Sequence, residues 1–236
     1  KIKLFLMTNL KDYNFFIFLE PNIIKFEAID DLNKVNFSKK KLIDNLYLAE
    51  NWDKLKNFLH NNIFDIEKNL NSYVKDINLI ISHDDFISVS MSMKFNSDRD
   101  QFHQNRLNSL LIDLKNQFKS TIEKFEIIHM IITKFNADGK TYLNISEINN
   151  FDKICLEIKF ICLKRNIIDD LKEIFFNYQI KIKNIICLEY LKDFREFSEK
   201  ESSILAGKVL NGLNQNEIFF SRKNTKNMSF FDKFFS

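Results

Sequence analysis

The sequence predicts an α+β fold, in which short strands and helices follow one another along the chain. Three observations lead to this prediction. Several short segments alternate apolar and polar residues with a period of two, as strands with one buried face do. Other segments repeat apolar residues every three or four positions, which is typical of amphipathic helices. With 236 residues, 45% of them hydrophobic, the chain is also long enough to bury a sizeable core.

The first third of the chain is predicted to form a strand meander followed by a helix. The expected strands are rich in Phe and Ile and are separated by polar breaks; they lie at residues 2–8, 14–19 and 23–29. Apolar residues then recur along one helical face from Trp52 to Leu70. A short strand at 77–81 follows, and His83-Asp84-Asp85 has the composition of a turn.

The middle of the chain has the clearest pattern. Residues 86–95 alternate strictly between apolar side chains and serine or lysine, which predicts a half-buried strand. A helical stripe at 107–122 comes next, and then two further strands at 126–135 and 154–162. Asp138-Gly139 provides turn chemistry that leads from the first of these strands into a short pairing at 141–143. The predicted order is therefore strand, helix, strand, strand.

After this unit, Asn166 is a candidate cap for a helix, and residues 181–188 read as one more apolar strand. From about residue 194 the pattern decays into charged and Asn-rich sequence. Residues 202–210 have the composition of a helix, but we interpret the range 194–227 as a partly ordered linker.

The composition argues against several functional classes. The three glycines, Gly139, Gly207 and Gly212, match neither the dinucleotide fingerprint nor the P-loop. A net charge of +3, with both signs alternating along the chain, gives no reason to expect a nucleic-acid partner. The sequence contains no run of 18 apolar residues, the length that indicates a spanning helix.

The residues that can carry chemistry do not form a recognisable site. Cys155, Cys162 and Cys187 form no C-x-x-C pair and lie in apolar runs, as buried small residues do. The histidines have no metal-ligand spacing; they are His60, His83, His103 and His129.

Other polar groups also have ordinary structural interpretations. The acidic doublets lie where turns and helix starts are expected; they are Asp30-Asp31, Asp84-Asp85 and Asp169-Asp170. Ser88, Ser90 and Ser92 lack a glycine-flanked elbow, and Lys39-Lys40-Lys41 reads as a solvated helix start. We therefore predict no catalytic residues, no metal and no cofactor, and a protein that is not an enzyme.

The last ten residues, NMSFFDKFFS, form a separate candidate site. On a helix the four phenylalanines fall on one side, and lysines lie nearby. Such a segment can fold as it inserts at a lipid interface. The predicted membrane-binding residues are Met228, Phe230, Phe231, Lys233, Phe234 and Phe235. The alternative is that the phenylalanines dock on the protein's own core or in a partner groove.

Element order and tail together resemble the bacterial cell-division protein FtsA, an actin-like membrane tether. DINLIISHDDFISVSM (76–91) is similar to the lead-in to the family's strand-helix-strand-strand insert, and EIIHMIITKFNADG (126–139) to a His-containing apolar strand that leads to an Asp-Gly turn. CLEIKFICLKRNIIDDLKEIFFNYQIKIKNIICLEY (155–190) resembles the last strand of the insert, followed by the helix and strand that return to the actin-like core. The family's first phosphate loop, of the Asp-Ile-Gly-Thr type, is expected between the first two strands, where LKDYN (10–14) has no glycine. The family's second lobe, with its Gly-rich phosphate loop and adenosine loop, has no counterpart after Ile186.

The resemblance implies a reduced actin-like protein without an ATP site. It divides the chain into an actin-like remnant (1–82), an SHS2-like insert (83–165), a helix-strand return to the actin-like core (166–193), a linker (194–227) and an amphipathic membrane-targeting helix (228–236). The implied function is a non-catalytic adaptor on the cytoplasmic face of the inner membrane, at the division site.

The implied partners are inner-membrane lipids, division-ring proteins and a second copy of the chain. FtsZ belongs to this group, although the family contacts it through the second lobe. Two alternatives remain open at this stage, namely a pilus-assembly relative in the actin-like family and an unrelated enzyme with an unrecognised site.

Overall fold

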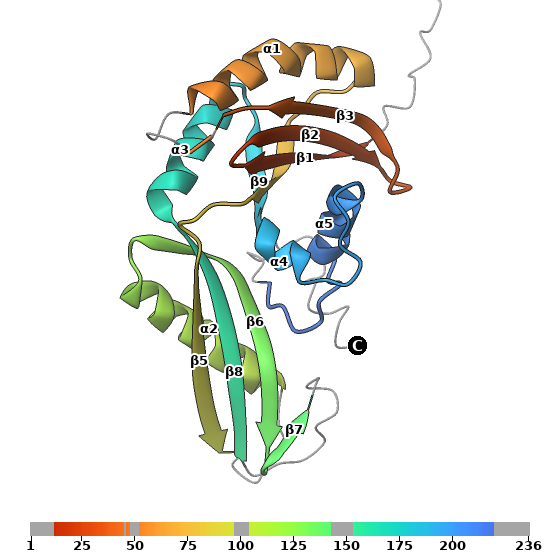
Figure 1. Cartoon of the computed structure of the whole chain (residues 1–236). Helices are drawn as coiled ribbons and strands as arrows, with labels where there is room; N and C mark the ends of the chain where they lie inside the picture. The colour runs from red at the N-terminus through yellow and green to blue at the C-terminus, as the bar shows by residue number, and fades with distance from the viewer. Residues whose placement is uncertain (1–11, 45, 48–51, 97–103, 143–152, 220–236) are drawn as a thin grey trace, which may run out of the picture.

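The computed structural model describes residues 12–44, 46–47, 52–96, 104–142 and 153–219, which form two β-sheets with helices against them (Figure 1). The predicted α+β class is confirmed. The second sheet and its helix are inserted between two parallel strands of the first.

The first sheet has the strand order β3-β2-β1-β4-β9. Its strands are β1 (Tyr13–Glu20), β2 (Ile23–Asp30), β3 (Val35–Leu42), β4 (Asp76–Ile81) and β9 (Lys181–Cys187). The first three form an antiparallel meander, whereas β4 and β9 continue the sheet in parallel with β1. Parallel strands need crossover connections, and α1 (Asp53–Leu70) provides one of them between β3 and β4.

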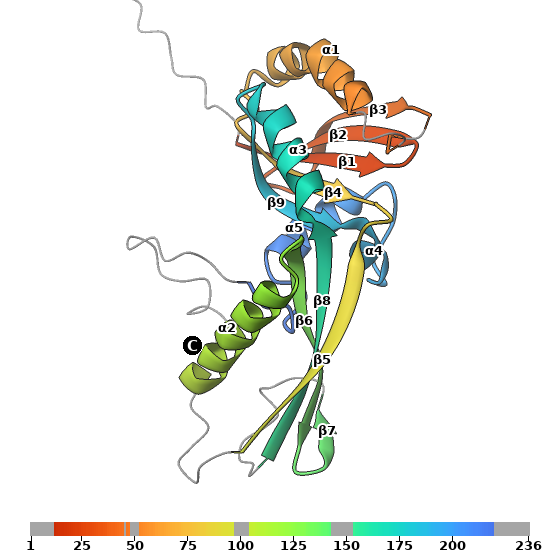
Figure 2. The same ribbon diagram turned by 90° about the vertical axis from the view of Figure 1, so that its left-hand side faces the viewer.

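Both faces of this sheet are covered, because its central strands are apolar on both sides. α1 and α3 (Arg165–Phe176) pack on one face, where they share a core with Ile17, Phe26 and Leu79. The short helices α4 (Leu188–Lys192) and α5 (Ser202–Leu210) close the other face over Phe16 and Ile80. Figure 2 shows the two pairs of helices on opposite sides of the sheet.

The second sheet has the order β5-β8-β6-β7, and all neighbouring strands are antiparallel. Its elements are β5 (Ile87–Asn96), α2 (Gln104–Thr121), β6 (Phe125–Ala137), β7 (Lys140–Tyr142) and β8 (Lys153–Lys164). α2 packs on one face, where the rings of Phe118 and Phe160 stack 4.1 Å apart. The predicted order of strand, helix, strand, strand is confirmed, and β7 forms the short pairing with β6 that was predicted after the Asp138-Gly139 turn.

The three consecutive lysines lie in a strand, whereas the sequence suggested the start of a helix. Lys39, Lys40 and Lys41 do not begin a helix; they are exposed on β3, the edge strand of the first sheet. An edge strand tolerates charged side chains because its outer side faces solvent. The meander thus consists of β1, β2 and β3, and the strand predicted at 2–8 lies outside the described residues.

The range predicted as a linker, 194–227, also differs from its interpretation wherever the structure describes it. α5 forms at the residues whose composition had suggested a helix, and its Leu205, Ala206 and Val209 are buried. This packing has a physical reason, since the second face of the sheet would otherwise expose a row of aromatic and aliphatic side chains. Residues 220–227 and the predicted membrane helix lie outside the described residues.

Candidate functional site

The resemblance implies a phosphate loop at residues 10–14, between the strands predicted at 2–8 and 14–19. Residues 10 and 11 lie outside the described residues, and Tyr13 and Asn14 begin β1. The first turn that the structure describes joins β1 to β2 and is formed by Pro21 and Asn22, where the sequence predicted a break. Pro21 has no N–H to offer an anion. The backbone N–H of Leu46 donates to the Pro21 carbonyl (2.6 Å), and that of Ile43 donates to the Asn22 carbonyl (3.0 Å). The turn is therefore tight, free of glycine and covered by the chain that follows β3.

Aromatic side chains pack at the carboxyl ends of β1 and β4, an edge at which α/β sheets commonly bind ligands. The Tyr47 hydroxyl donates to the Leu19 carbonyl at 2.8 Å, and its ring lies 4.2 Å from the His83 ring and 5.8 Å from the Trp52 ring. Burial, together with the charges of Glu20 and Asp84, raises the pKa of Tyr47 far above its usual value. Tyr47 is therefore a neutral hydrogen-bond donor that helps to close this end of the sheet.

His83 belongs to the same group. Its Nδ1 accepts the backbone N–H of Asp85 at 3.0 Å, which fixes the turn predicted from the sequence. Burial lowers the pKa of His83, although the carboxylates of Asp85 and Asp84 oppose this shift. Asp85 in turn pairs with Lys164 at 2.7 Å. These contacts assign His83 and Asp85 to structural roles at the junction of the two sheets.

A buried polar network lies where the two sheets meet. His129 on β6 contacts Glu217 (Nδ1 to Oε1, 2.6 Å), and the hydroxyl of Tyr190 on α4 donates to Glu217 Oε2 at 2.7 Å. Asn214 donates to the Tyr190 hydroxyl at 2.8 Å. His129 is 4% exposed, Tyr190 6% and Glu217 8%, so the network is shielded from solvent.

The hydrogen bonds fix the protonation pattern of this network. The backbone N–H of Cys187 donates to Nε2 of His129 at 3.0 Å, so Nε2 is an acceptor and the ring proton is on Nδ1. Nδ1–H then donates to Glu217, which accepts a second bond from Tyr190. Burial and the Glu217 carboxylate raise the pKa of Tyr190, so its hydroxyl remains a donor. Every member has partners, which is the arrangement of a structural lock rather than of an open catalytic centre.

The same network attaches the end of the described chain to the second sheet. The backbone N–H of Ile132 donates to the Asn216 carbonyl, and that of Ile218 donates to the Met130 carbonyl, at 2.9 and 2.8 Å. Residue 217 thereby forms a bridge with Ile131 on the open side of β6. The network thus joins β6, α4 and the segment after α5. Sequence analysis assigned His129 an ordinary hydrogen-bonded role, which is confirmed, but it missed Tyr190, Asn214 and Glu217.

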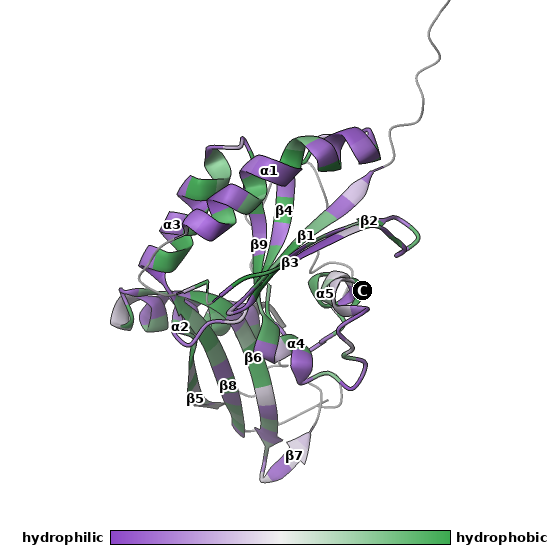
Figure 3. Cartoon of the chain, turned by 45° about the horizontal axis from the view of Figure 1, so that its top comes forward, coloured by the Kyte–Doolittle hydropathy of each residue, from purple (hydrophilic) through white to green (hydrophobic). Residues whose placement is uncertain are grey.

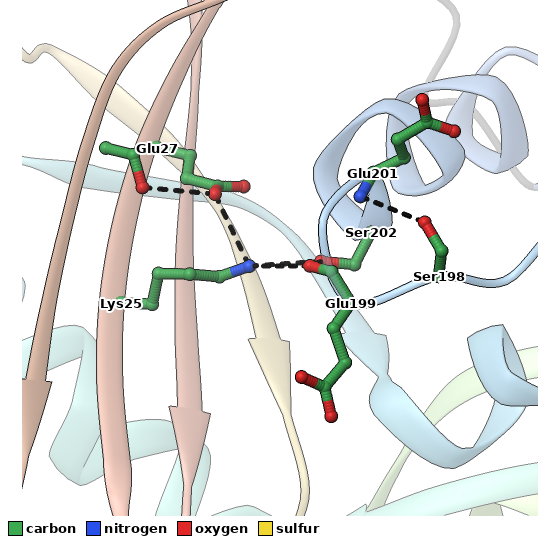
Figure 4. Close-up of polar contacts among 7 residues, drawn as sticks. Lys25, Glu27, Ser198, Glu199, Glu201 and Ser202 are labelled. Carbon is green, nitrogen blue, oxygen red and sulfur yellow. Dashed lines mark hydrogen bonds and ion pairs between the residues drawn. The ribbon is translucent and has the colours of Figure 1, made fainter.

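A second polar cluster lies beneath the start of α5 (Figure 4). The Lys25 Nζ pairs with Glu27 Oε1 at 3.4 Å, donates to Ser202 Oγ at 3.1 Å and lies 3.8 Å from the Phe18 ring centroid. Glu27 is only 5% exposed, and its second oxygen, Oε2, has no hydrogen-bond partner among the described residues. The ion pair lies within β2, and the hydrogen bond from Lys25 to Ser202 links this strand to α5.

The other predicted groups do not converge on a site. Cys162 and Cys187 are buried, and burial raises the pKa of both thiols, that of Cys162 to about 12. Asp30 accepts the N–H groups of Leu32 and Lys34 in a turn, as expected. Among the described residues, no group of three His, Cys, Asp or Glu side chains is placed to hold a metal ion.

The remaining predicted residues are separate or lie beyond the described part. His60, Asp84, Asp169 and Asp170 are exposed, and Ser88, Ser90 and Ser92 lie on the exposed face of β5. His103 and all the predicted membrane-binding residues lie outside the described residues; the latter are Met228, Phe230, Phe231, Lys233, Phe234 and Phe235. None of the helices in the described part has the length and hydrophobicity required to cross a bilayer.

Comparison with known proteins gives distant structural matches alone. No family model and no curated protein matches the sequence. One similar structure is a PilM-PilN type IV pilus biogenesis complex (TM-score 0.46, 7% identity, covering 77% of this chain and 49% of that one). Another is the cytoplasmic domain of EpsL, an inner-membrane component of the type II secretion system of Vibrio cholerae (TM-score 0.38, 12% identity, covering 78% of this chain and 59% of that one).

A third similar structure is a protein of unknown function from Bacteroides thetaiotaomicron with an actin-like ATPase fold (TM-score 0.34, 14% identity, covering 79% of this chain and 57% of that one). The chain spans between about half and three-fifths of the length of these structures.

Proposed function

We propose that this chain is a non-catalytic docking module of a protein assembly at a bacterial inner membrane. In this role its folded part presents surfaces to other proteins, and its Phe-rich C-terminal segment binds lipid. The module does not hydrolyse or sense a nucleotide. Buried contacts of His129 on β6 join the two sheets, since its ring accepts the backbone N–H of Cys187 on β9 and also contacts Glu217.

The observation that supports this proposal most strongly is the closed turn at Pro21 and Asn22. An actin-like lobe needs free backbone N–H groups at this turn to hold phosphate, and glycine to let the phosphate approach. Here proline removes one N–H, and the carbonyls of both turn residues accept bonds from Leu46 and Ile43. Tyr47 and Trp52 pack at the same end of the sheet.

The assembly that we favour is a pilus or secretion machine. A pilus-assembly relative was one of the two alternatives that the sequence left open. Two of the similar structures carry such names, a pilus biogenesis complex and a secretion-system component. The division adaptor remains the second candidate, and the observation in its favour is the terminal NMSFFDKFFS, which resembles the membrane helix of FtsA. The partners expected from the sequence, division-ring proteins including FtsZ, belong to this second candidate.

A nucleotide titration tests the non-catalytic part of the proposal. We expect no saturable binding of Mg-ATP or Mg-ADP to the full chain at millimolar nucleotide, measured by calorimetry. The physical reason is that the turn offers no cradle of N–H groups for the phosphates. An actin-like ATPase with intact phosphate loops is the positive control. Binding with one-to-one stoichiometry, or phosphate release above the rate without protein, would contradict the proposal.

A further inference from the structure

Within the described residues the two sheets have four edge strands, and three of them have features that hinder pairing with another chain. β3 carries three exposed lysines and a register shift against β2. β9 carries exposed Lys181 and Lys183 and a register shift against β4. β7 has only three residues. Charge, irregular register and short length are the usual means by which proteins protect sheet edges.

The fourth edge strand, β5, lacks these protections. It is ten residues long, and its pairing with β8 runs from Ile87 to Asn96 without a register shift. One face presents Ser88, Ser90 and Ser92, all exposed, and the strand's single charged residue, Lys94, lies near its end. Figure 1 shows β5 at the outer side of the second sheet.

The other face of β5 is incompletely covered. Its apolar residues pack against the core beneath α2, yet each remains partly exposed, and no other strand of the described residues pairs with the outer side of β5; they are Ile87, Val89, Met91 and Met93. In the central strand β8, by contrast, Leu156, Ile158 and Phe160 are fully buried. A further strand beside β5 would complete the burial of this apolar row.

We propose that β5 pairs with β5 of a second copy of this chain, antiparallel and across a two-fold axis close to Met91. Such an axis keeps the same face of both strands on the same side of the joined sheet, since side chains alternate with a period of two. Serines then meet serines, and the partly exposed apolar residues meet one another. This pairing of like side chains follows from the alternation of polar and apolar residues along β5 and requires no other protein.

The distribution of charge is compatible with this pairing. With the axis at Met91, Ser90 lies opposite Ser92, and Lys94 lies opposite Ser88. No like charges face each other directly across the pair, whereas self-pairing of β3 would crowd three lysines from each copy. The second copy is therefore a better occupant of β5 than of the other long edges, and the inference holds whether or not the proposed membrane function does.

Sedimentation equilibrium of the full chain tests the proposal. The wild-type protein should reach a monomer–dimer equilibrium, and the double variant Ser90→Lys/Ser92→Lys should weaken the dimer at least tenfold, because it places lysines opposite one another. The matched control adds the same charge to β3 at two exposed positions, Asn36→Lys/Leu42→Lys, and should leave the dimer unchanged. Circular dichroism checks that each variant is folded.

Disulfide trapping locates the axis. In a Cys155→Ser background, a cysteine should cross-link most strongly within residues 90–92, where each position lies close to its own copy, and least at Ser88→Cys. A chain that stays monomeric at all concentrations would overturn the proposal and would leave β5 open to a strand from another protein. A dimer that the charge variant does not weaken, or that cross-links equally at every position, would overturn it as well.

Discussion

Replacing Glu217 with alanine is expected to lower the free energy of unfolding by about 3 kcal/mol or more. The change leaves the Nδ1–H of His129 and the hydroxyl of Tyr190 buried without an acceptor, and each orphaned donor costs about 1–3 kcal/mol. It also releases the segment that bridges to β6. Urea denaturation, followed by the fluorescence of the single tryptophan, Trp52, measures the effect.

Glu196→Ala is the matched control, since Glu196 is exposed and should change stability by less than about 0.5 kcal/mol. Tyr190→Phe removes one hydrogen-bond donor and keeps the ring, so its loss of stability should lie between those of Glu196→Ala and Glu217→Ala. If Glu217→Ala were as stable as Glu196→Ala, the network would not lock the two sheets together.

A second large loss of folding stability is expected when Lys25 is replaced. Lys25→Met keeps the apolar stem over Phe18 but leaves the Glu27 carboxylate buried without its cation, which should cost about 3–5 kcal/mol. The double variant Lys25→Met/Glu27→Leu should recover most of this loss, because a buried ion pair replaced by apolar residues is often neutral in stability. Urea denaturation of both single variants and the double variant forms a thermodynamic cycle.

Lys40→Met serves as the control for this cycle. Lys40 pairs with Lys25 through the backbone of β3, but its own side chain is exposed. This control should change stability by less than about 0.5 kcal/mol. Additive losses in the double variant would mean that Lys25 and Glu27 are not coupled, and the ion pair would then not account for the cost of Lys25→Met.

Sequence periodicity was sufficient to locate the helices and strands that have a strong apolar pattern. The helix at Trp52–Leu70 and the strict alternation of residues 86–95 lie within one or two residues of α1 and β5. Local patterns of this kind follow directly from one buried face. β3 was missed because its second half consists of lysines, and only its place at the edge of the sheet explains how a strand tolerates them.

The polar networks could not be predicted from the sequence, because only the tertiary fold brings their members together. His129 and Glu217 are separated by 88 positions in sequence, and Lys25 and Ser202 by 177. A histidine within an otherwise apolar strand signals a buried partner but does not identify it. Similarly, α5 has a readable helical composition, yet its role in covering the sheet depends on the aromatic residues of β1, far away in the chain.

Vesicle flotation of the full chain tests the proposed membrane-docking function most directly. The control variant replaces Phe230, Phe231, Phe234 and Phe235 with serine and keeps every charge. The wild-type chain is expected to float with anionic vesicles, and to do so less at high salt, because lipid insertion of the phenylalanines and attraction of the lysines act together. The serine variant should remain at the bottom of the gradient. Equal flotation of both chains, or no flotation of either, would contradict the account.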